Sequence, residues 1–412
     1  MQLIGFLKRI NFSIFLSITL LSKIGSKIYL LGMPWLVYDL TGSAIGMGIM
    51  FFAETLPYIF MAPIAGHLVD NLSTKLLMSI SSLVEASCVV AIPILHVFSV
   101  LNVTEVYILG FILSCASATY MVLNDTILPQ LFTNDSLEKA NSIIQLIDTG
   151  TMLLGASIGG VLISVFGVFG LFWVIMVAYA VISPLALVLN LSRHHSSENH
   201  PPPNSLRQFI DSFRYVIKHS SIRPLVILNL LANITAATVD SLLIFFLRHQ
   251  LHLTSTKVGL TYGVGGVAEV LGAIIAPVLA RRRLSVGTIM IICQLVYAFG
   301  VMWMAFSLGW ITVGVGIMIQ SIPVVIYNIF SRSMRQRVVP SNMLGRVNGI
   351  FLMLGQAAYP AAGFASSAVA QFAGVRNVFI VVAWFTVFVS LIYWFSPFRK
   401  NQFVNSGRST MT

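Results

Sequence analysis

The sequence predicts an all-α protein that crosses a membrane many times. The 412-residue chain is 57% hydrophobic and only 9% charged, with a mean hydropathy of +0.90, whereas about a quarter of the residues in soluble domains are charged. Its apolar runs approach the roughly 20 residues that a helix needs to span a bilayer. They lack the alternation of apolar and polar residues that marks barrel strands. The two halves of the chain also echo each other.

Twelve apolar segments can be marked along the chain. They cover residues 12–38, 44–66, 76–98, 104–126, 143–165, 170–191, 224–247, 258–280, 287–307, 310–330, 346–368 and 374–395. Longer polar links fall at 127–142, 192–223 and 331–345. We therefore predict an N-terminal six-helix bundle (1–191), a cytoplasmic linker (192–223), a C-terminal six-helix bundle (224–396) and a cytoplasmic tail (397–412).

Three ordered pairs of segments suggest that the two bundles are pseudo-symmetric repeats. Residues 40–46 (LTGSAIG) resemble 253–259 (LTSTKVG), and 62–75 (APIAGHLVDNLSTK) resemble 276–285 (APVLARRRLS). Residues 130–142 resemble 337–349. Transporters built from repeats bind substrate near mid-membrane at the repeat interface and work by rocking one half against the other.

The distribution of Lys and Arg predicts the orientation. With the N-terminus inside, the outer side carries only Arg248, Lys257 and Arg376, while Lys23 and Lys27 fall within the first segment and all other basic residues face inward. Both termini should be cytoplasmic. The net charge of +11 then reflects topology and attraction to anionic lipids, so we expect no nucleic-acid partner.

The linker contains a predicted helix over residues 205–219, with Leu206, Phe209, Ile210, Phe213, Val216 and Ile217 on one face. Two interpretations are open: a basic amphipathic helix on the inner membrane surface, or a short helix packed against the ends of the bundle.

No acidic or cysteine partner completes a metal site with His194, His195 and His200. Cys88, Cys115 and Cys293 lack metal or disulfide spacing and should be buried as small hydrophobes. We predict no metal and no cofactor.

The segment Gly66-His67-Leu68-Val69-Asp70 followed by Lys75 resembles the loop between helices two and three of the major facilitator superfamily. The resemblance extends over nearly the whole chain and implies the fold of that family. It also implies that Asp70 closes a charge lock in one conformational state. Asn71, Ser73 and Thr74 depart from the family pattern. Capping of the next helix by Asp70 or Ser73 is the alternative.

Glycines of the fifth segment, Gly150, Gly155, Gly159 and Gly160, resemble the glycine-rich stretch of drug–proton antiporters, with Ala156 where that family has proline. Close helix packing through small residues is the alternative. The patterns WLVYDLTGSAIG and LPYIFMAPIAGHLVD are similar to the exporter branch that includes macrolide efflux pumps and the enterobactin exporter. This resemblance implies a bacterial inner membrane.

Ionisable residues at bilayer depth cost about 2.5–3.5 kcal/mol each on insertion scales and call for a partner or a function. Lys23 and Lys27 share one face of the first helix. We predict that they line the cavity and that Glu54 or Asp148 neutralises them and exchanges protons. A static ion pair is the alternative. Glu85 also lies at depth.

In the second half, Asp240 and Glu269 are the predicted proton sites, because no lysine or arginine lies deep in that half to pair with them. Trp35 is expected to anchor a helix end at the membrane interface. Phe51, Phe52, Tyr262 and Tyr327 could line a ligand pocket, and lipid-facing packing is the other interpretation for each.

These observations predict a proton-coupled secondary transporter, a monomer, that exports a small organic molecule by alternating access. The substrate would be a siderophore-like metabolite or a drug; two lysines favour an anion, while Glu54 leaves cationic drugs open. The alternative is an importer of a ferric siderophore or a nutrient. The sequence has no H-E-x-x-H or G-x-x-x-x-G-K-[ST] motif, so we expect neither an enzyme nor a pump driven by ATP.

Overall fold

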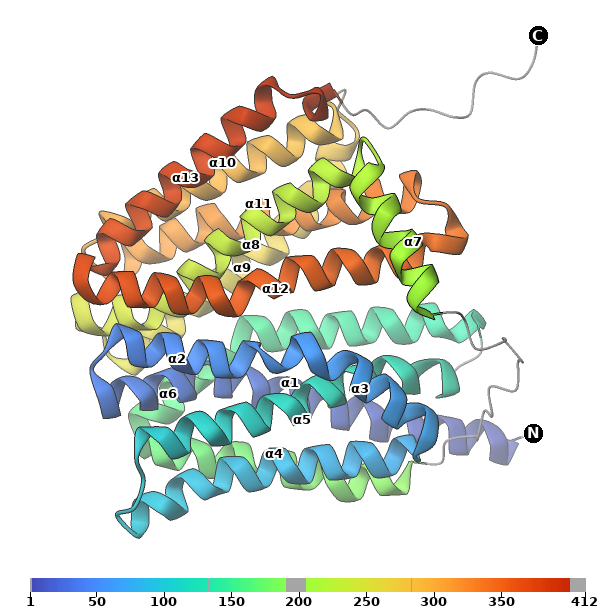
Figure 1. The fold of residues 1–412 in the computed structure, drawn as a ribbon. Coiled ribbons are helices and arrows are strands. Elements are labelled where there is room, and N and C mark those ends of the chain that lie inside the picture. Colours follow the sequence, from blue (N-terminus) through green and yellow to red (C-terminus); the bar gives the residue numbers. More distant parts are fainter. Residues whose placement is uncertain (1, 132–133, 190–204, 283, 401–412) are drawn as a thin grey trace. The chain divides into compact units, whose positions relative to one another are not determined.

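The computed structural model describes residues 2–131, 134–189, 205–282 and 284–400, and within these residues every regular element is helical (Figure 1). The helices of the first half are α1 (Gln2–Thr41), α2 (Ala44–Thr55), α3 (Pro57–Asn71), α4 (Thr74–Val97), α5 (Val103–Leu131) and α6 (Asn134–Val188). Those of the second half are α7 (Ser205–Lys218), α8 (Ile222–Phe245), η1 (Phe246–Gln250), α9 (Ser255–Ala280), α10 (Val286–Ala305), α11 (Trp310–Val338), α12 (Ser341–Ala373), α13 (Val375–Phe395) and η2 (Pro397–Lys400).

The helices account for twelve membrane crossings. In the described residues, ten stretches are long and apolar enough to span a bilayer. One of them, in α6, contains two crossings, because the backbone breaks at Gly167 with φ 71° and ψ 172°. Such a positive φ strongly favours glycine. The twelfth crossing is α12, which is long enough but rich in Gly, Ala, Ser and Gln. The all-α membrane fold predicted from the sequence is confirmed.

Two features of the helices differ from the predicted segments. The polar links at 127–142 and 331–345 are largely helical, because α5 continues to Leu131 and α11 to Val338. The predicted segment 44–66 is broken between α2 and α3, where Pro57 occupies the first turn of α3. Proline has no backbone N–H to continue the α2 hydrogen-bond ladder, so the helix is interrupted one turn after Glu54.

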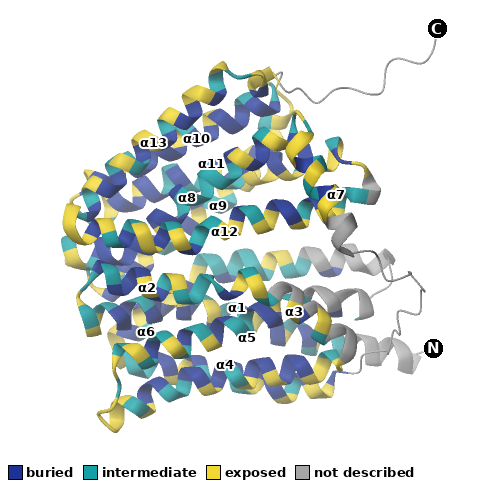
Figure 2. Cartoon of the chain, in the orientation of Figure 1, coloured by how far each residue is buried: buried dark blue, intermediate teal, exposed yellow. Residues whose placement is uncertain are grey.

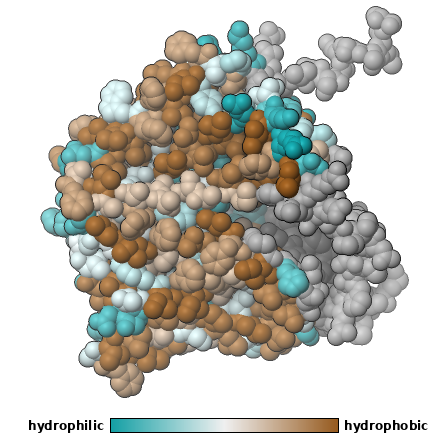
Figure 3. Space-filling model, in the orientation of Figure 1, coloured by the Kyte–Doolittle hydropathy of each residue, from teal (hydrophilic) through white to brown (hydrophobic). Residues whose placement is uncertain are grey.

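The outward faces of the helices are apolar, as expected for a surface in contact with lipid. Figure 3 shows apolar side chains over most of the visible face, and Figure 2 shows exposed positions recurring along α13. The exposed large apolar residues of α13 are Val381, Trp384, Phe385, Phe388, Leu391, Ile392 and Phe395. Exposed apolar area this extensive is uncommon on soluble monomers, so this stripe faces the acyl chains.

The chain forms two compact units. Unit 1 comprises Met1–Asn199, Ser241–Gly266 and Gly363–Gln371, and unit 2 comprises His200–Asp240, Val267–Ala362 and Phe372–Thr412. In unit 1, α1 and α4 pack on α6, while α2, α3 and α4 pack on α5. In unit 2, α10 packs on α11 and α13. Unit 1 therefore includes parts of α8, α9 and α12 from the second half. The division at residues 191 and 224 follows the repeats and stays a prediction.

Helix α7 packs against the helices of unit 2. Ser212 and Val216 are buried, and the Tyr215 hydroxyl donates to the backbone oxygen of Val338 over 3.4 Å. The opposite face exposes Ile210, Asp211, Arg214, Ile217 and Lys218. The side chains of Leu206 and Phe209 lie outside the described part. The observed contacts agree with the interpretation that this helix packs against the ends of the bundle. Contact of its exposed cations with membrane lipid stays a proposal.

The turns that follow each odd-numbered membrane crossing and lead to the next even-numbered one are short. They consist of residues 42–43, 98–102, the break at Gly167, 251–254, 306–309 and Gly374. Gly374 has a φ of 81°, which again suits glycine. In a twelve-span topology these turns share one side of the membrane.

Candidate functional site

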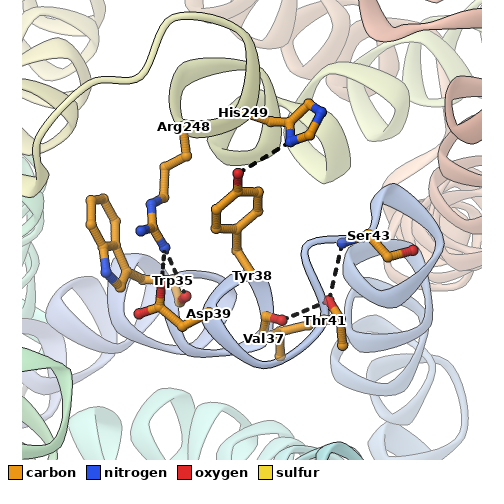
Figure 4. Close-up of polar contacts among 8 residues, drawn as sticks. All are labelled: Trp35, Val37, Tyr38, Asp39, Thr41, Ser43, Arg248 and His249. Carbon is orange, nitrogen blue, oxygen red and sulfur yellow. Dashed lines mark hydrogen bonds and ion pairs between the residues drawn. The ribbon is translucent and has the colours of Figure 1, made fainter.

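A cluster of aromatic and charged side chains joins the end of α1 to η1, and both segments belong to unit 1. We call it the Arg248 cluster; its members are Trp35, Tyr38, Asp39, Arg248 and His249 (Figure 4). The helix α8 passes into the π-helical turn η1 at Phe246. A π turn holds an extra residue and is common at functional sites. Figure 4 shows Arg248 extending to Trp35 and Asp39 of α1, and Tyr38 extending from α1 to His249.

Arg248 interacts with α1 in three ways. Its Nη1 lies 2.6 Å from Asp39 Oδ1 and donates to the backbone oxygen of Trp35 over 3.3 Å. Its guanidinium carbon lies 3.7 Å from the ring centroid of Trp35 and 4.4 Å from that of Tyr38. A cation over an aromatic face contributes about 0.5–2 kcal/mol, and a partly exposed ion pair about 0.2–1 kcal/mol. The aromatic contacts are therefore at least as important as the ion pair.

His249 extends the cluster. Its Nδ1 lies 3.2 Å from the Tyr38 hydroxyl, and its ring stacks on Phe245 with centroids 4.6 Å apart. The Tyr38 ring meets Phe245 edge-on at 5.8 Å. Trp35 is only 8% exposed, so the prediction that it anchors the membrane interface is wrong: the ring is covered by Arg248.

A second contact closes the same end of unit 1, where α12 reaches α2. Gln371 Oε1 accepts hydrogen bonds from Ser43 Oγ (3.0 Å) and from the backbone N–H of Ala44 (2.9 Å). The first N–H groups of a helix lack partners within the helix, so Gln371 caps α2 from a distant part of the sequence. We call this region, where α1, α2, η1 and α12 meet, the Gly42 end.

The predicted glycines of α6 lie where helices approach closely. A Cβ on Gly155 would lie 2.4 Å from Lys27 Cβ on α1, and one on Gly159 would lie 3.5 Å from Ile28 Cα. A Cβ on Gly160 would lie 2.4 Å from the backbone oxygen of Ser255 on α9. Gly150 has open space around it. The first two glycines therefore fit α6 against α1, and Gly160 fits it against α9.

On the α9 side, glycines complete this seam. A Cβ on Gly259 would lie 2.7 Å from the backbone oxygen of Ala156, and one on Gly266 would lie 2.8 Å from Leu153 Cα. Ser157 Oγ donates to the backbone oxygen of Gly259 over 3.2 Å. Small residues on both helices let the backbones touch. We call this contact the glycine seam.

Lys23 and Asp148 form an ion pair between α1 and α6. Lys23 Nζ lies 2.8 Å from Asp148 Oδ1, and both side chains are about one-third exposed, at 34% and 38%. Lys27 forms no salt bridge with any described residue. Of the two acids considered for the lysines, the structure thus brings Asp148 to Lys23 and leaves Glu54 elsewhere.

Glu54 and Glu85 lie inside unit 1 without a basic partner among the described residues. Glu54 Oε1 and Glu85 Oε2 are buried and make no hydrogen bond. Glu85 Oε1 accepts a hydrogen bond from Ser117, and the Tyr29 phenol lies close enough to Glu54 to interact with it. Burying a carboxylate without a cation is costly, so these positions suit a neutral acid that can lose its proton when water reaches it.

In unit 2, Asp240 accepts a hydrogen bond from the Tyr359 hydroxyl on α12. Asp240 is exposed and Glu269 half-buried.

The expectation that no cation is buried in this half is wrong, because Arg335 is only 8% exposed. Arg335 contacts neutral groups: Nε donates to Asn348 Oδ1 and Nη1 to Ser331 Oγ, each over 2.8 Å, and the guanidinium lies over Phe351. The elongation of α11 beyond the predicted segment carries Arg335 under α12.

Other predicted site residues fall only partly within the described part of the chain. Gly66 and Asp70 fall in α3 and Lys75 is exposed at the start of α4, but the side-chain surroundings of Gly66 and Asp70 lie outside the described part. The tract with His194, His195 and His200 also lies outside it. Cys88 and Cys293 are buried and Cys115 is half-buried, and all are free thiols.

Sequence reasoning missed the Arg248 cluster. Asp39 was not among the candidate residues, and Arg248 was counted only as a charge on the outer side. The available signal was the spacing of Trp35, Tyr38 and Asp39, which places two rings and a carboxylate on one helix face. The partner is more than 200 positions away and could not be assigned from spacing.

Helices that cross the membrane, charged residues at membrane depth and tight glycine contacts are typical of a membrane transporter. The chain belongs to the Major Facilitator Superfamily, whose family model matches residues 15–363. The multidrug efflux pump Tap of Mycolicibacterium fortuitum is 24% identical over 389 residues, covering 90% of this chain and 92% of that protein. An uncharacterised transporter of the same type from Sinorhizobium fredii, y4rN, is 24% identical over 355 residues, or 85% of each chain.

Solved structures share the fold. The nucleoside transporter NupG superposes with a TM-score of 0.76 at 14% identity, covering 92% of this chain and 98% of that one. A bacterial homologue of the iron transporter ferroportin, in an inward-facing state, gives 0.74 at 17% identity, covering 93% and 98%. At these identities the likeness establishes the fold alone.

Proposed function

We propose that this protein exports drug-like organic molecules across the bacterial inner membrane, driven by protons, with both termini in the cytoplasm. The direction and the class of substrate rest on the similarity to the efflux pump Tap, which extends over 90% of this chain. The orientation rests on the scarcity of Lys and Arg on one side.

The observation that carries proton coupling is the set of carboxyls at membrane depth without a basic partner among the described residues. Glu54 and Glu85 each leave a buried oxygen without a hydrogen bond. Asp240 is held by a neutral phenol. An acid in a low dielectric keeps its proton until solvent or a ligand stabilises the charge. A conformational change that wets the buried oxygens of Glu54 and Glu85 would therefore release protons. Asp240 is already exposed and is a candidate through its contact with Tyr359 alone.

The Gly42 end is the region that we expect to open and close during transport. Alternating access requires each side of the membrane to open in turn, and by the predicted orientation this end faces outward. The Arg248 cluster, the Gln371 cap and the glycine seam join residues of both halves of the sequence there. We propose that these contacts break when the protein opens to the outside and that the lock at Gly66, Asp70 and Lys75 acts at the other side.

The charge on the lysines bears on the substrate. Asp148 neutralises Lys23, so the argument for an anionic siderophore now rests on Lys27 alone. We therefore favour drugs over siderophores as substrates and export over import. The exposed Arg214 and Lys218 of α7 would attract anionic lipid headgroups, and we expect the protein to act as a monomer.

The test is transport by the purified full-length protein in liposomes. We expect an imposed proton gradient to drive accumulation of a fluorescent drug such as ethidium, and this drive to be lost in Glu54→Gln, Glu85→Gln, Asp240→Asn or Glu269→Gln. Exchange of drug at equal concentrations, which needs no net proton movement, should persist in a variant that has lost only coupling. Wild-type transport that ignores the gradient would overturn the coupling, and unchanged transport in one variant would remove that carboxyl from the mechanism.

A further inference from the structure

Unit 2 contains a cavity, with several amide and hydroxyl side chains in an otherwise apolar lining, that the charged sites described above do not include. It has a volume of about 70 Å³ and is lined by residues of α8, α10 and α11. Its lining residues are Asn229, Ala232, Asn233, Thr235, Ala236, Cys293, Gln294, Tyr297, Pro323, Val324, Tyr327 and Asn328. All of them belong to unit 2, so the cavity is formed within one compact unit.

The lining is rich in neutral hydrogen-bonding groups. Carboxamides come from Asn229, Asn233, Gln294 and Asn328, while hydroxyls come from Thr235, Tyr297 and Tyr327. None of the lining residues is charged. Amides and hydroxyls both donate and accept hydrogen bonds. The cavity therefore matches a group of the same kind, and it offers no counter-charge to an ion.

One of these groups lacks a partner. The Tyr327 hydroxyl is buried and makes no hydrogen bond, although the residue is only 4% exposed. Leaving a buried donor unsatisfied costs about 1–3 kcal/mol. Val324 and Asn328, which also line the cavity, are exposed, so the cavity has an open side as well as a buried wall.

The amides of Asn229 and Asn233 lie next to Gly355 of α12. A Cβ on Gly355 would lie 2.6 Å from Nδ2 of Asn229 and 2.8 Å from Nδ2 of Asn233. Asn229 and Asn233 are four residues apart and so lie on the same face of α8. The absence of a side chain at Gly355 thus leaves room for both amides beside α12, and any side chain added there would displace them.

We propose that this cavity binds an uncharged group bearing hydroxyls or amides on a small organic molecule. The share of liquid volume per water molecule is about 30 Å³, so the cavity has room for a few heavy atoms and the rest of the ligand extends past Asn328. The proposal deepens the proposed function, because it assigns a neutral polar group to the exported molecules, and binding can be measured without transport.

The experiment uses the purified full-length protein and titration calorimetry with two probes. Chloramphenicol is neutral and carries hydroxyls and an amide, and tetraphenylphosphonium is a cation with no hydrogen-bonding group. We expect Tyr327→Phe and Asn233→Ala to weaken chloramphenicol binding about 3- to 10-fold, the effect of one net hydrogen bond. Binding of tetraphenylphosphonium should stay within about twofold.

Tyr393→Phe is the matched control, since Tyr393 is a buried tyrosine of the same unit whose hydroxyl donates to the backbone oxygen of Pro224 over 2.8 Å, outside the cavity. It should leave chloramphenicol binding unchanged. Absence of chloramphenicol binding to the wild type, or equal weakening by Tyr393→Phe, would overturn the proposal. If Asn233→Ala fails to fold, chloramphenicol binding by Tyr327→Phe is sufficient to test the proposal. Binding that depends on Tyr327 without gradient-driven export would support the cavity and overturn the proposed coupling.

Discussion

The guanidinium of Arg248 lies over the indole of Trp35, 3.7 Å from its centroid, while the same side chain reaches Asp39 across 2.6 Å. The pair joins positions more than 200 residues apart, at the end where α1 meets η1. Both side chains of the ion pair are partly accessible, with Arg248 17% exposed and Asp39 39%. The contact is strong enough to favour one state of this end and weak enough to break in a transport cycle.

Replacing Arg248 by Gln should make the Gly42 end open more readily. The loss of the ring contact and the ion pair amounts to about 1–2 kcal/mol, which corresponds to roughly a 5- to 30-fold change in the population of open molecules. We would measure the rate at which a membrane-impermeant maleimide labels Ser43→Cys from outside, in a background lacking Cys88, Cys115 and Cys293.

Two controls accompany this measurement. Arg248→Lys keeps a charge for Asp39 but loses the planar group over the ring, so labelling should be intermediate. Arg376→Gln removes another cation, which donates instead to the backbone oxygen of Ser307 in unit 2, and should leave labelling unchanged. Equal labelling of Arg248→Gln and the wild type would show that the cluster does not hold this end closed.

Gly160→Ala should damage the protein far more than Gly150→Ala, although both glycines lie in α6. A methyl group at Gly160 meets the backbone of Ser255 at 2.4 Å, and one at Gly150 meets nothing within 4 Å. Overpacking costs about 1–3 kcal/mol, while alanine at an open helical position gains up to about 1 kcal/mol. Melting temperatures of the two purified variants should therefore move in opposite directions, with export lost only in Gly160→Ala. A shift in the same direction for both would argue against the glycine seam.

Asp148→Asn should retain drug exchange but lose export driven by a proton gradient, if Asp148 carries a proton rather than only pairing with Lys23. The pair is about one-third exposed, so its contribution to stability should be at most about 1 kcal/mol. The informative comparison is the double variant Lys23→Gln with Asp148→Asn in the liposome assay. We expect it to stay uncoupled. Recovery of gradient-driven export in the double variant would identify a static ion pair, since removing both partners of such a pair is less costly than removing one.

His219 should make the stability of unit 2 depend on pH. It lies between α7 and α8, and its Nδ1 accepts hydrogen bonds from the N–H groups of Ser221 (3.2 Å) and Ile222 (3.4 Å). Burial lowers the pKa of His219 from its ordinary 6.5. The unfolded chain then binds the proton more readily, so this contribution is complete above about pH 6.5 and is lost as the pH falls through the lower folded pKa.

The variant His219→Asn isolates this effect, because asparagine can still accept the N–H groups at the start of α8 but does not titrate. We expect the melting temperature of the wild type to fall more steeply than that of the variant between pH 7 and pH 5. Parallel curves for the two proteins would contradict the assignment.

Much of the fold could be predicted because membrane crossings are set by local composition. Hydropathy gave the positions of the helices, whereas the division into two sets of six, which the repeats suggest, stays a prediction. The errors lie where polar residues continue a helix beyond the apolar core, as in α11 up to Arg335, and where Pro57 breaks a single apolar run. Helix continuation depends on backbone hydrogen bonds, which hydropathy does not report.

The candidate site was predicted less completely, because its residues meet through packing between distant segments. Lys23 and Asp148 were both named as charged residues at depth, yet the preference between Asp148 and Glu54 required the 2.8 Å distance. Neutral residues carry still less signal. Tyr327 was considered for a pocket on its aromatic character, whereas Asn229 and Asn233 have no motif to mark them and gain meaning only beside Gly355.

The short turns at the Gly42 end, none longer than residues 98–102, leave almost no polypeptide beyond the helices on that side. A protease added there would find few extended segments to cleave, and an antibody would find few loops to recognise. Reporters and affinity tags are therefore better attached to the opposite side.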